Sequence, residues 1–255
     1  MRHPAFRLLL SLPLAGLLAG CAATVQQAAS ARRPPAAPAR VHCSTETTTV
    51  GSGRVALAAV VRNRARAYRR PASRSFARFG RLNQNGFPTV FRVLAVVRAR
   101  DCSARWYRVQ LPLRPNGATG YIRASAVRVE RVPTRILVDI SERRLTFFRG
   151  ERRVLTTTVA VGAAATPTPT GRYYVNQRLV PEDTSGPFGP GAIGISAFSE
   201  VLTGWAQGGP IAIHGTNEPW SIGHAASNGC IRVRNPVLER LFRSTPAGTP
   251  VLIRR

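Results

Sequence analysis

The pattern of apolar and polar positions opens with one predominantly apolar run and then changes to short alternating segments. The run covers residues 8–18, which is shorter than the roughly 20 residues that a membrane-spanning helix needs. Arg2 and Arg7 give it a positively charged leading end, which is typical of an export signal. We therefore expect residues 1–20 to be a signal peptide and the mature protein to function outside the cytoplasm.

Residues 54–130 predict a small β module. Apolar and polar residues alternate with the period of a strand in four segments, at 54–61, 89–97, 106–111 and 120–129. Turn formers such as Asn85-Gly86 separate them, and strands this short favour a small barrel over a helical domain. Before this module, residues 21–53 include an Ala- and Pro-rich stretch without periodicity, which predicts an extended, solvated tether.

Residues 131–255 predict a second, β-rich domain. Strand-like alternation recurs at 136–140, 144–149 and 154–162, and Gly150 lies where a hairpin would turn. Pro- and Gly-rich stretches at 163–171 and 181–194 predict long loops, where binding residues are often found. Asn235, followed by a proline, predicts the cap of a short helix, and residues 251–253 predict a last strand. The expected fold class is therefore mainly β, with one short helix.

The candidate chemistry lies in residues 210–235. An apolar strand ends at His214, and a turn precedes Cys230, so that the two side chains could meet at neighbouring strand ends. A thiol nucleophile needs a base, and the base needs an acceptor on its other nitrogen to fix its orientation. Gly229 would let backbone amides approach and stabilise an oxyanion. These parts support acyl transfer, although a Cys and a His at this spacing also occur as structural residues.

The four cysteines have different expected roles. The segment that ends in Cys21 resembles a bacterial lipoprotein box, which implies that Cys21 is lipidated and anchors the chain to a membrane. Cys43 and Cys102 then either form a disulfide or remain buried thiols, and Cys230 is the odd thiol. Because His214, His224 and Cys230 lack the spacing of zinc ligands, we expect no metal, and we interpret His224 as a solvated loop residue.

The charge is strongly basic and unevenly distributed. The chain has 37 basic residues, all of them Arg, against 11 acidic residues, which gives a formal charge of +26. Residues 54–130 alone carry 17 Arg and two acidic residues. Such a surface favours polyanionic partners, unless it only reflects a GC-rich genome. Export, together with the lack of a basic helix or an RNP-like strand, argues against nucleic acid as the partner.

Two longer motifs resemble a known family. His214–Asn217 together with Ser227–Arg232 strongly resembles the signature of the L,D-transpeptidase (YkuD-type) family of peptidoglycan enzymes, and Thr168–Tyr173 resembles its Thr-Pro-x-Gly element. In the preceding module, Trp106–Val109 and Gly120–Ile122 resemble the closing strands of bacterial SH3-like domains. The resemblance implies an SH3-like barrel followed by an L,D-transpeptidase domain.

The same resemblance implies roles for individual residues. Cys230 would be the nucleophile and His214 the general base and acid, with the carbonyl of Gly215 orienting the imidazole. The amides of Asn228, Gly229 and Cys230 would donate to the oxyanion, and Ser227 would belong to the same substrate-binding turn. Arg232 would hold a carboxylate of the substrate or buttress the loop, and a purely structural ion pair is the alternative. Many members of the family have His where Asn228 stands here.

The resemblance further implies peptidoglycan stem peptides as substrates, acyl transfer through a thioester without a cofactor, and acylation by carbapenems. The acceptor could be the amine of another stem, a protein lysine, or water, which would make the chain an L,D-carboxypeptidase. The competing class is a non-catalytic, cationic lipoprotein that binds the cell envelope. The sequence leaves open the diamino acid of the stem, the ligand of the SH3-like module, the membrane that holds the anchor and the oligomeric state.

Overall fold

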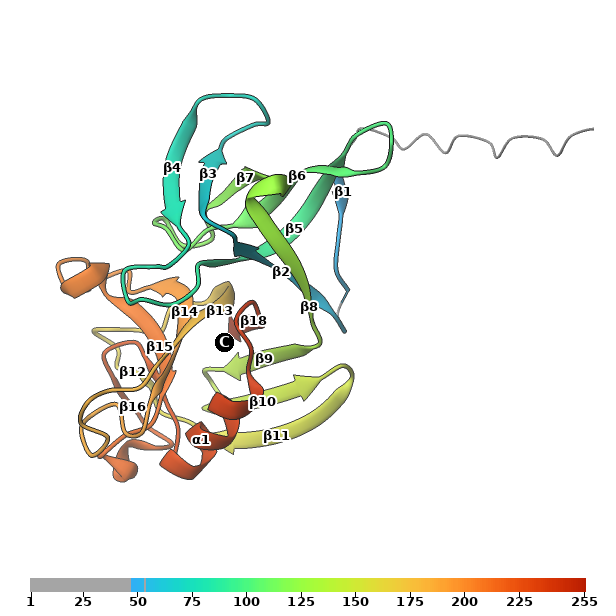
Figure 1. Ribbon diagram of the computed structural model, residues 1–255. Coiled ribbons are helices and arrows are strands. Elements are labelled where there is room, and N and C mark those ends of the chain that lie inside the picture. Colours follow the sequence, from blue (N-terminus) through green and yellow to red (C-terminus); the bar gives the residue numbers. More distant parts are fainter. Residues whose placement is uncertain (1–46, 53) are drawn as a thin grey trace, which may run out of the picture. The chain divides into compact units, whose positions relative to one another are not determined.

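The computed structural model describes residues 47–52 and 54–255, which form two large sheets (Figure 1). The chain passes from the first sheet to the second at Pro133. The predicted signal peptide, Cys21 and Cys43 lie outside the described residues. The expected fold class is confirmed, because an antiparallel sheet is followed by a mixed sheet with one short α-helix. The described residues of both sheets belong to one compact unit. In this part of the chain no helix has the length and apolar character needed to cross a bilayer.

The N-terminal sheet has the strand order β4-β3-β7-β6-β5-β2-β8, and β1 pairs with β5. Its elements are β1 (Thr47–Thr49), β2 (Ala56–Val61), β3 (Arg64–Tyr68), β4 (Ser75–Gly80), β5 (Val90–Arg98), β6 (Ala104–Gln110), β7 (Thr119–Arg123), the 3-10 turn η1 (Ala124–Ala126) and β8 (Val127–Val132). Strand β1 lies within the segment assigned to the tether. The likeness of this module to SH3 domains stays a prediction.

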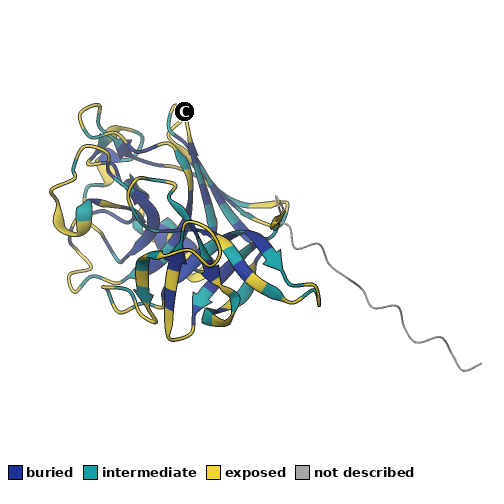
Figure 2. Cartoon of the chain, turned by 90° about the horizontal axis from the view of Figure 1, so that it is seen from above, coloured by how far each residue is buried: buried dark blue, intermediate teal, exposed yellow. Residues whose placement is uncertain are grey.

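Two strands of this sheet, β3 and β4, were not predicted. In β3 the arginines are exposed while Ala65 and Ala67 are buried, so the strand does alternate, but its inward residues are small. Alanine is a weak strand signal in a sequence, and only packing against the neighbouring strands shows that these positions are interior. Figure 2 shows the same alternation of buried and exposed positions along the strands.

The C-terminal sheet has the order β11-β10-β9-β18-β13-β14-β15-β17, and β12 pairs with β16 beside it. Its elements are β9 (Thr134–Asp139), β10 (Arg144–Arg149), β11 (Arg152–Thr158), β12 (Val161–Gly162), β13 (Gly171–Leu179), β14 (Ala192–Phe198), the turn η2 (Ala206–Gly208), β15 (Pro210–His214), the turn η3 (Pro219–Ser221), β16 (Ala225–Ser227), β17 (Ile231–Arg232), α1 (Asn235–Ser244) and β18 (Pro250–Arg254). The last strand lies centrally, parallel to β9 and antiparallel to β13.

Strand β14 begins at Ala192, so it includes only the last three residues of the range 181–194 for which a long loop was expected. All of its residues except Phe198 are buried, so it shows no alternation of apolar and polar positions. Strands covered on both faces read as continuous apolar runs, which a sequence pattern does not distinguish from other buried segments. The helix α1 was predicted, and it buries Leu238 and Leu241. Its cap differs, since Arg234 occupies the cap position and Asn235 makes no capping bond.

The two sheets are joined by directional, partly buried hydrogen bonds. The hydroxyl of Tyr174, a fully buried residue of β13, donates to the carbonyl of Val90 in β5 at 3.1 Å. The side chain of Asn116 donates to the carbonyl of Phe198 at 2.8 Å and accepts from its N–H at 2.9 Å. Such bonds are expensive to break when they are buried, so they fix the N-terminal module against β13 and β14.

One cysteine of the described region is oxidised and one is reduced. Cys102 is disulfide-bonded, whereas Cys230 is a free thiol. The pairing of Cys102 with Cys43 stays a prediction, because Cys43 lies outside the described residues.

The substitution Gly248→Ala tests the packing between the modules. Gly248 has φ +87°, and a Cβ there would lie 2.3 Å from the Cβ of Ala58. Gly117 has a similar φ of +81° but nothing within 4 Å of its Cβ position, so Gly117→Ala is the matched control for backbone strain. We expect Gly248→Ala to lower the free energy of unfolding by about 2 kcal/mol more than the control, measured by urea denaturation. Equal losses would contradict a tight contact at Gly248.

Candidate active site

The register of two parallel strands brings His214 and Cys230 together. His214, the last residue of β15, lies opposite Arg232 of β17. Cys230 directly precedes β17, and extending this register by two residues places it beside Ala212, whose backbone forms a hydrogen bond with it. Alternate residues of a strand point to the same face of a sheet, so all four side chains share one face. His214 and Cys230 are therefore diagonal neighbours on the sheet, as the sequence predicts.

The imidazole of His214 is buried and held by the backbone. Its Nδ1 lies 2.5 Å from the carbonyl oxygen of Gly215, which can only accept, so Nδ1 carries the proton and Nε2 keeps its lone pair. The ring of Phe188 packs against it with a centroid distance of 4.9 Å. Burial lowers the pKa of His214 to about 4, assisted by the positive charge of Arg232, although the bond to Gly215 acts in the opposite direction. The imidazole is therefore neutral at pH 7.

The thiol of Cys230 is also held in its neutral form. Burial raises the pKa of Cys230 above its ordinary value, while a backbone hydrogen bond from Ala212 and the charge of Arg232 oppose this shift. A neutral thiol beside a neutral imidazole can react when the base removes the proton as sulfur attacks. The site is therefore suited to general-base activation of the thiol and not to a standing thiolate–imidazolium pair.

A clamp of hydrogen bonds fixes the turn before Cys230. The hydroxyl of Ser227 accepts from the N–H of Gly229 at 3.2 Å and donates to the carbonyl of Cys230 at 2.5 Å. The buried hydroxyl of Thr168 donates to the carbonyl of Gly229 at 2.9 Å and accepts from the N–H of Gly162 at 2.8 Å. Gly229 has φ +106°, a conformation that favours glycine. Its N–H, one of the predicted oxyanion donors, is engaged by Ser227.

The charged residue beside the thiol has a protein partner. Arg232 forms an ion pair with Glu218, and its side chain is only 15% exposed. Its Nε is buried and has no hydrogen-bond partner among the described residues. The ion pair is the alternative that the sequence left open for Arg232. Asn228 and His224 are exposed, and within the described region no cluster of three His, Cys, Asp or Glu side chains could hold a metal ion.

Asn235 is a site residue that sequence reasoning assigned differently. Its Oδ1 accepts the N–H of Thr216 at 2.7 Å, which holds the chain directly after Gly215. A Cβ on Gly215 or Gly189 would lie 2.4 Å from this oxygen, so the backbone packs closely around it. The sequence predicts a helix cap at Asn235, because a local pattern shows that a side-chain oxygen is available but does not identify its distant partner.

The comparisons with known proteins cover mainly the C-terminal half of the chain. Residues 133–253 match the family model described as YkuD, L,D-transpeptidase catalytic domain. YkuD of Bacillus subtilis, whose name places it among the L,D-transpeptidases, is 39% identical over 124 residues, covering 49% of this chain and 68% of that protein. ErfK/SrfK of Salmonella typhimurium, named in the same way, is 28% identical over 172 residues, covering 57% of this chain and 52% of that protein.

Among solved structures, Bd1075 of Bdellovibrio bacteriovorus is 26% identical with a TM-score of 0.38, and the match covers 48% of this chain and 47% of that chain.

The clamp at Thr168 can be tested by Thr168→Val, which keeps the shape and removes the hydroxyl. The change leaves the carbonyl of Gly229 and the N–H of Gly162 without this partner. We expect the free energy of unfolding to fall by about 2 kcal/mol in urea denaturation. Thr156→Val, at an exposed position of β11, is the control and should change stability by less than about 0.5 kcal/mol. Indistinguishable effects of the two changes would contradict the clamp.

The lowered pKa of His214 predicts a dependence of stability on pH. Because the pKa of His214 is about 4 in the folded chain and 6.5 ordinarily, the unfolded chain binds more protons between these values, and stability falls as the pH falls. From pH 7 to pH 5 this contribution amounts to a loss of about 2 kcal/mol. In His214→Gln, the loss of stability from pH 7 to pH 5, measured by urea denaturation, should be smaller than in the unchanged protein by about 2 kcal/mol. The same loss in both proteins would refute the prediction.

Proposed function

Because the chain belongs to the L,D-transpeptidase family of YkuD-type catalytic domains, we propose that it forms peptidoglycan cross-links by acyl transfer through a thioester on Cys230. The observation that carries the proposal is the shared face of His214 and Cys230, with the imidazole oriented by Gly215. The family supports the reaction class, and the geometry supports Cys230 as the nucleophile and His214 as the base. No cofactor takes part in the proposed reaction.

In the first step, Nε2 of His214 removes the thiol proton while the sulfur of Cys230 attacks the carbonyl carbon of the third residue of a tetrapeptide stem. A carbon–sulfur bond forms, and the carbonyl oxygen carries the negative charge of the tetrahedral intermediate. The intermediate collapses as the carbon–nitrogen bond to the terminal D-alanine breaks. The leaving nitrogen takes the proton from His214, so D-alanine departs as an amine and a thioester remains.

In the second step, an acceptor attacks the thioester and the thiol is restored. An amine of a second stem loses a proton to His214 as its nitrogen bonds to the carbonyl carbon, and the sulfur then leaves and is reprotonated. The product is a 3-3 cross-link. A protein lysine as acceptor would give an anchored protein, and water would give an L,D-carboxypeptidase. The thioester conserves the energy of the original amide, so no nucleotide is required.

The remaining site residues have supporting roles in this proposal. The amide of Asn228, an exposed residue, would donate to the oxyanion, whereas the amide of Gly229 already donates to Ser227. Arg232 keeps a positive charge close to the thiol, and its partial burial with Glu218 fixes where that charge lies. A carboxylate of the stem could replace Glu218 as its partner, because Glu218 is 43% exposed. The proposal also includes acylation of Cys230 by carbapenems.

The proposed location is the cell envelope. Residues 1–20 would be removed as a signal peptide, and a lipid on Cys21 would hold the protein at a membrane. The tether and the N-terminal module, which we propose is SH3-like, would extend from the membrane towards the wall. The net charge of +15 on residues 54–130 would attract this module to anionic wall and envelope polymers.

The test is to incubate the purified 255-residue chain, in mild detergent, with a disaccharide-tetrapeptide and to record intact mass and products. We expect an acyl-enzyme that lacks D-alanine and is absent in Cys230→Ala, together with a dimer linked 3-3. Release of tripeptide alone would identify a carboxypeptidase.

The second candidate is a non-catalytic, cationic envelope-binding lipoprotein, which the high charge of the N-terminal module favours. Circular dichroism would first establish that the sample is folded. A folded protein that forms no acyl-enzyme with any stem peptide or carbapenem would refute the enzyme and leave this binding protein. Unchanged envelope binding in Cys230→Ala would then be expected.

A further inference from the structure

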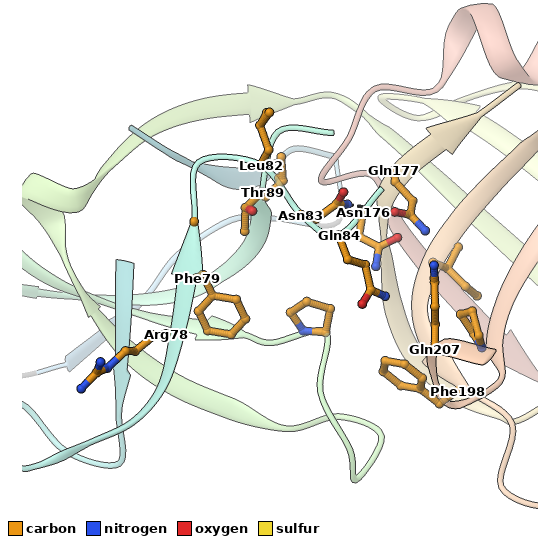
Figure 3. Close-up of a pocket in the computed structure, with 15 residues that line it drawn as sticks. Arg78, Phe79, Leu82, Asn83, Gln84, Thr89, Asn176, Gln177, Phe198 and Gln207 are labelled. Carbon is orange, nitrogen blue, oxygen red and sulfur yellow. Dashed lines mark hydrogen bonds between the residues drawn. The ribbon is translucent and has the colours of Figure 1, made fainter. Parts of the chain in front are cut away.

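A cavity of about 290 Å³ lies where the two sheets meet, away from the catalytic turn (Figure 3). Five primary amides from both modules line it: Asn83, Gln84, Asn176, Gln177 and Gln207. Phe79 and Phe198 add aromatic surface from opposite sides, as Figure 3 shows. The lining includes no carboxylate, and its one arginine, Arg78, points away from the cavity. The cavity is thus neutral, although the module around it is strongly basic.

This lining suits an uncharged ligand with many hydrogen-bonding groups. A primary amide offers donors on nitrogen and an acceptor on oxygen, which matches hydroxyl and acetamido groups. A charged ligand would lose its hydration without gaining an opposite charge. The aromatic rings can cover the apolar face of a sugar ring, and the volume is near the lower end for small-ligand sites. The chemistry therefore favours an N-acetylated sugar over a peptide with ionised side chains.

One buried amide oxygen of the cavity has no partner among the described residues. Gln177 is saturated at Oε1, which accepts from Asn83 at 2.8 Å and from Asn85 at 3.0 Å. By contrast, Oδ1 of Asn176 is buried and has no hydrogen-bond partner among the described residues. A buried acceptor without a partner destabilises a fold by about 1–3 kcal/mol. Because this oxygen itself has almost no accessible surface, an N–H or O–H group of a ligand would remove the penalty only after the Asn176 side chain turns towards the cavity.

The cavity is connected to the thiol by a row of residues across the sheet. Gln177 lies opposite Gly194, Gly194 lies opposite Ala212, and the register of β15 and β17 places Ala212 opposite Cys230. The side chain of Gln177 leans over Gly194, since a Cβ on Gly194 would lie 2.6 Å from its Cγ. Gly194 is buried and covered by Gln177, so the row gives the direction and the number of strands between the cavity and the nucleophile.

The distance from the cavity to Cys230 fits the proposed substrate. Neighbouring strands lie about 4.8 Å apart, so the three steps from Gln177 to Cys230 span about 14 Å. A stem extended over three residues covers about 10 Å, and its link to the sugar covers further distance. A sugar ring in the cavity would therefore allow the carbonyl of the third stem residue to reach Cys230.

We propose that the cavity between the two sheets is a binding subsite for an N-acetylated sugar of the glycan strand, and that it sets the position of the attached stem relative to Cys230. The positioning of the stem rests on the proposed function, whereas sugar binding itself does not. The N-terminal module supplies half of the subsite, which gives it a direct part in substrate selection. Asn176 and Gln84 are the residues to change, since each adds a polar group to the cavity from a different module.

The first test is binding of the neutral tetramer of N-acetylglucosamine to the full chain by isothermal titration calorimetry. Asn176→Leu removes the unused acceptor at similar size, and Gln84→Ala changes an exposed side chain that makes no hydrogen bond within the described residues. We expect each variant to weaken the Kd by about fivefold to tenfold, the effect of one hydrogen bond. Arg108→Ala, at an exposed position outside the cavity, should leave the Kd unchanged.

Stability measurements separate binding from folding. Asn176→Leu should keep or raise the urea midpoint, because it removes a buried unpaired oxygen. If Asn176→Leu does not fold, Gln84→Ala decides the question. An unchanged Kd in the folded variants, or equal binding of the glucose tetramer that lacks acetamido groups, would overturn the proposal.

A kinetic readout separates this proposal from the proposed function. Both variants should lower kcat/KM about fivefold for a glycan-linked tetrapeptide and leave it unchanged for the free tetrapeptide, because only the former occupies the cavity. An equal loss with both substrates would mean that the residues act through the fold, and would overturn the positioning of the stem. If no protein is acylated by any substrate, the proposed function fails while the calorimetry still decides whether the sugar site exists.

Discussion

The parallel pairing of β15 with β17 is the constraint on which the site depends. Side chains alternate between the two faces of a strand, so a shift of one residue in this register would turn Cys230 away from His214 and into the core. The pairing is short, and it is supported from both sides. Ala160 exchanges backbone hydrogen bonds with Arg232, and the N–H of Val233 donates to the carbonyl of His214. The start of the crossover between the strands is held by two contacts, from Thr216 to Asn235 and from Glu218 to Arg232.

Burial acts on both reacting groups in the same direction, towards the uncharged form. It lowers the pKa of His214 and raises the pKa of Cys230, so a charged pair is disfavoured at rest. Arg232 opposes this effect at the thiol and reinforces it at the imidazole. This positive charge therefore favours the negative charge that develops on sulfur and disfavours the positive charge that develops on the imidazole. The ion pair with Glu218 determines how much of that charge reaches the thiol, which links the crossover loop to the chemistry.

The fold could be predicted from the sequence where local patterns are strong, and not where packing decides. The strands at 136–140 and 144–149 alternate clearly and begin and end close to the expected positions. Strand β14 was not predicted, and its first three residues fell in an expected loop, because the strand is buried on both faces and follows many glycines and prolines. His214, Gly215 and Cys230 could be proposed from the sequence because they lie in two short runs of characteristic residues. The partners of Thr168 and Asn235 lie 61 and 19 residues away, and no local pattern identifies them.

In the N-terminal module, the charged surface and the neutral cavity would have different roles in binding. Its arginines lie largely on exposed strand positions, as Arg64 and Arg66 do in β3, where they act on any anionic polymer within roughly 10 Å at moderate salt. The cavity beside β13 has no acidic residue in its lining and relies on amides and aromatic rings. Charge of this kind raises the rate of encounter, whereas directional neutral contacts discriminate between ligands. A basic surface around a neutral cavity therefore suits a protein that must first reach a charged envelope and then choose among uncharged sugar rings within it.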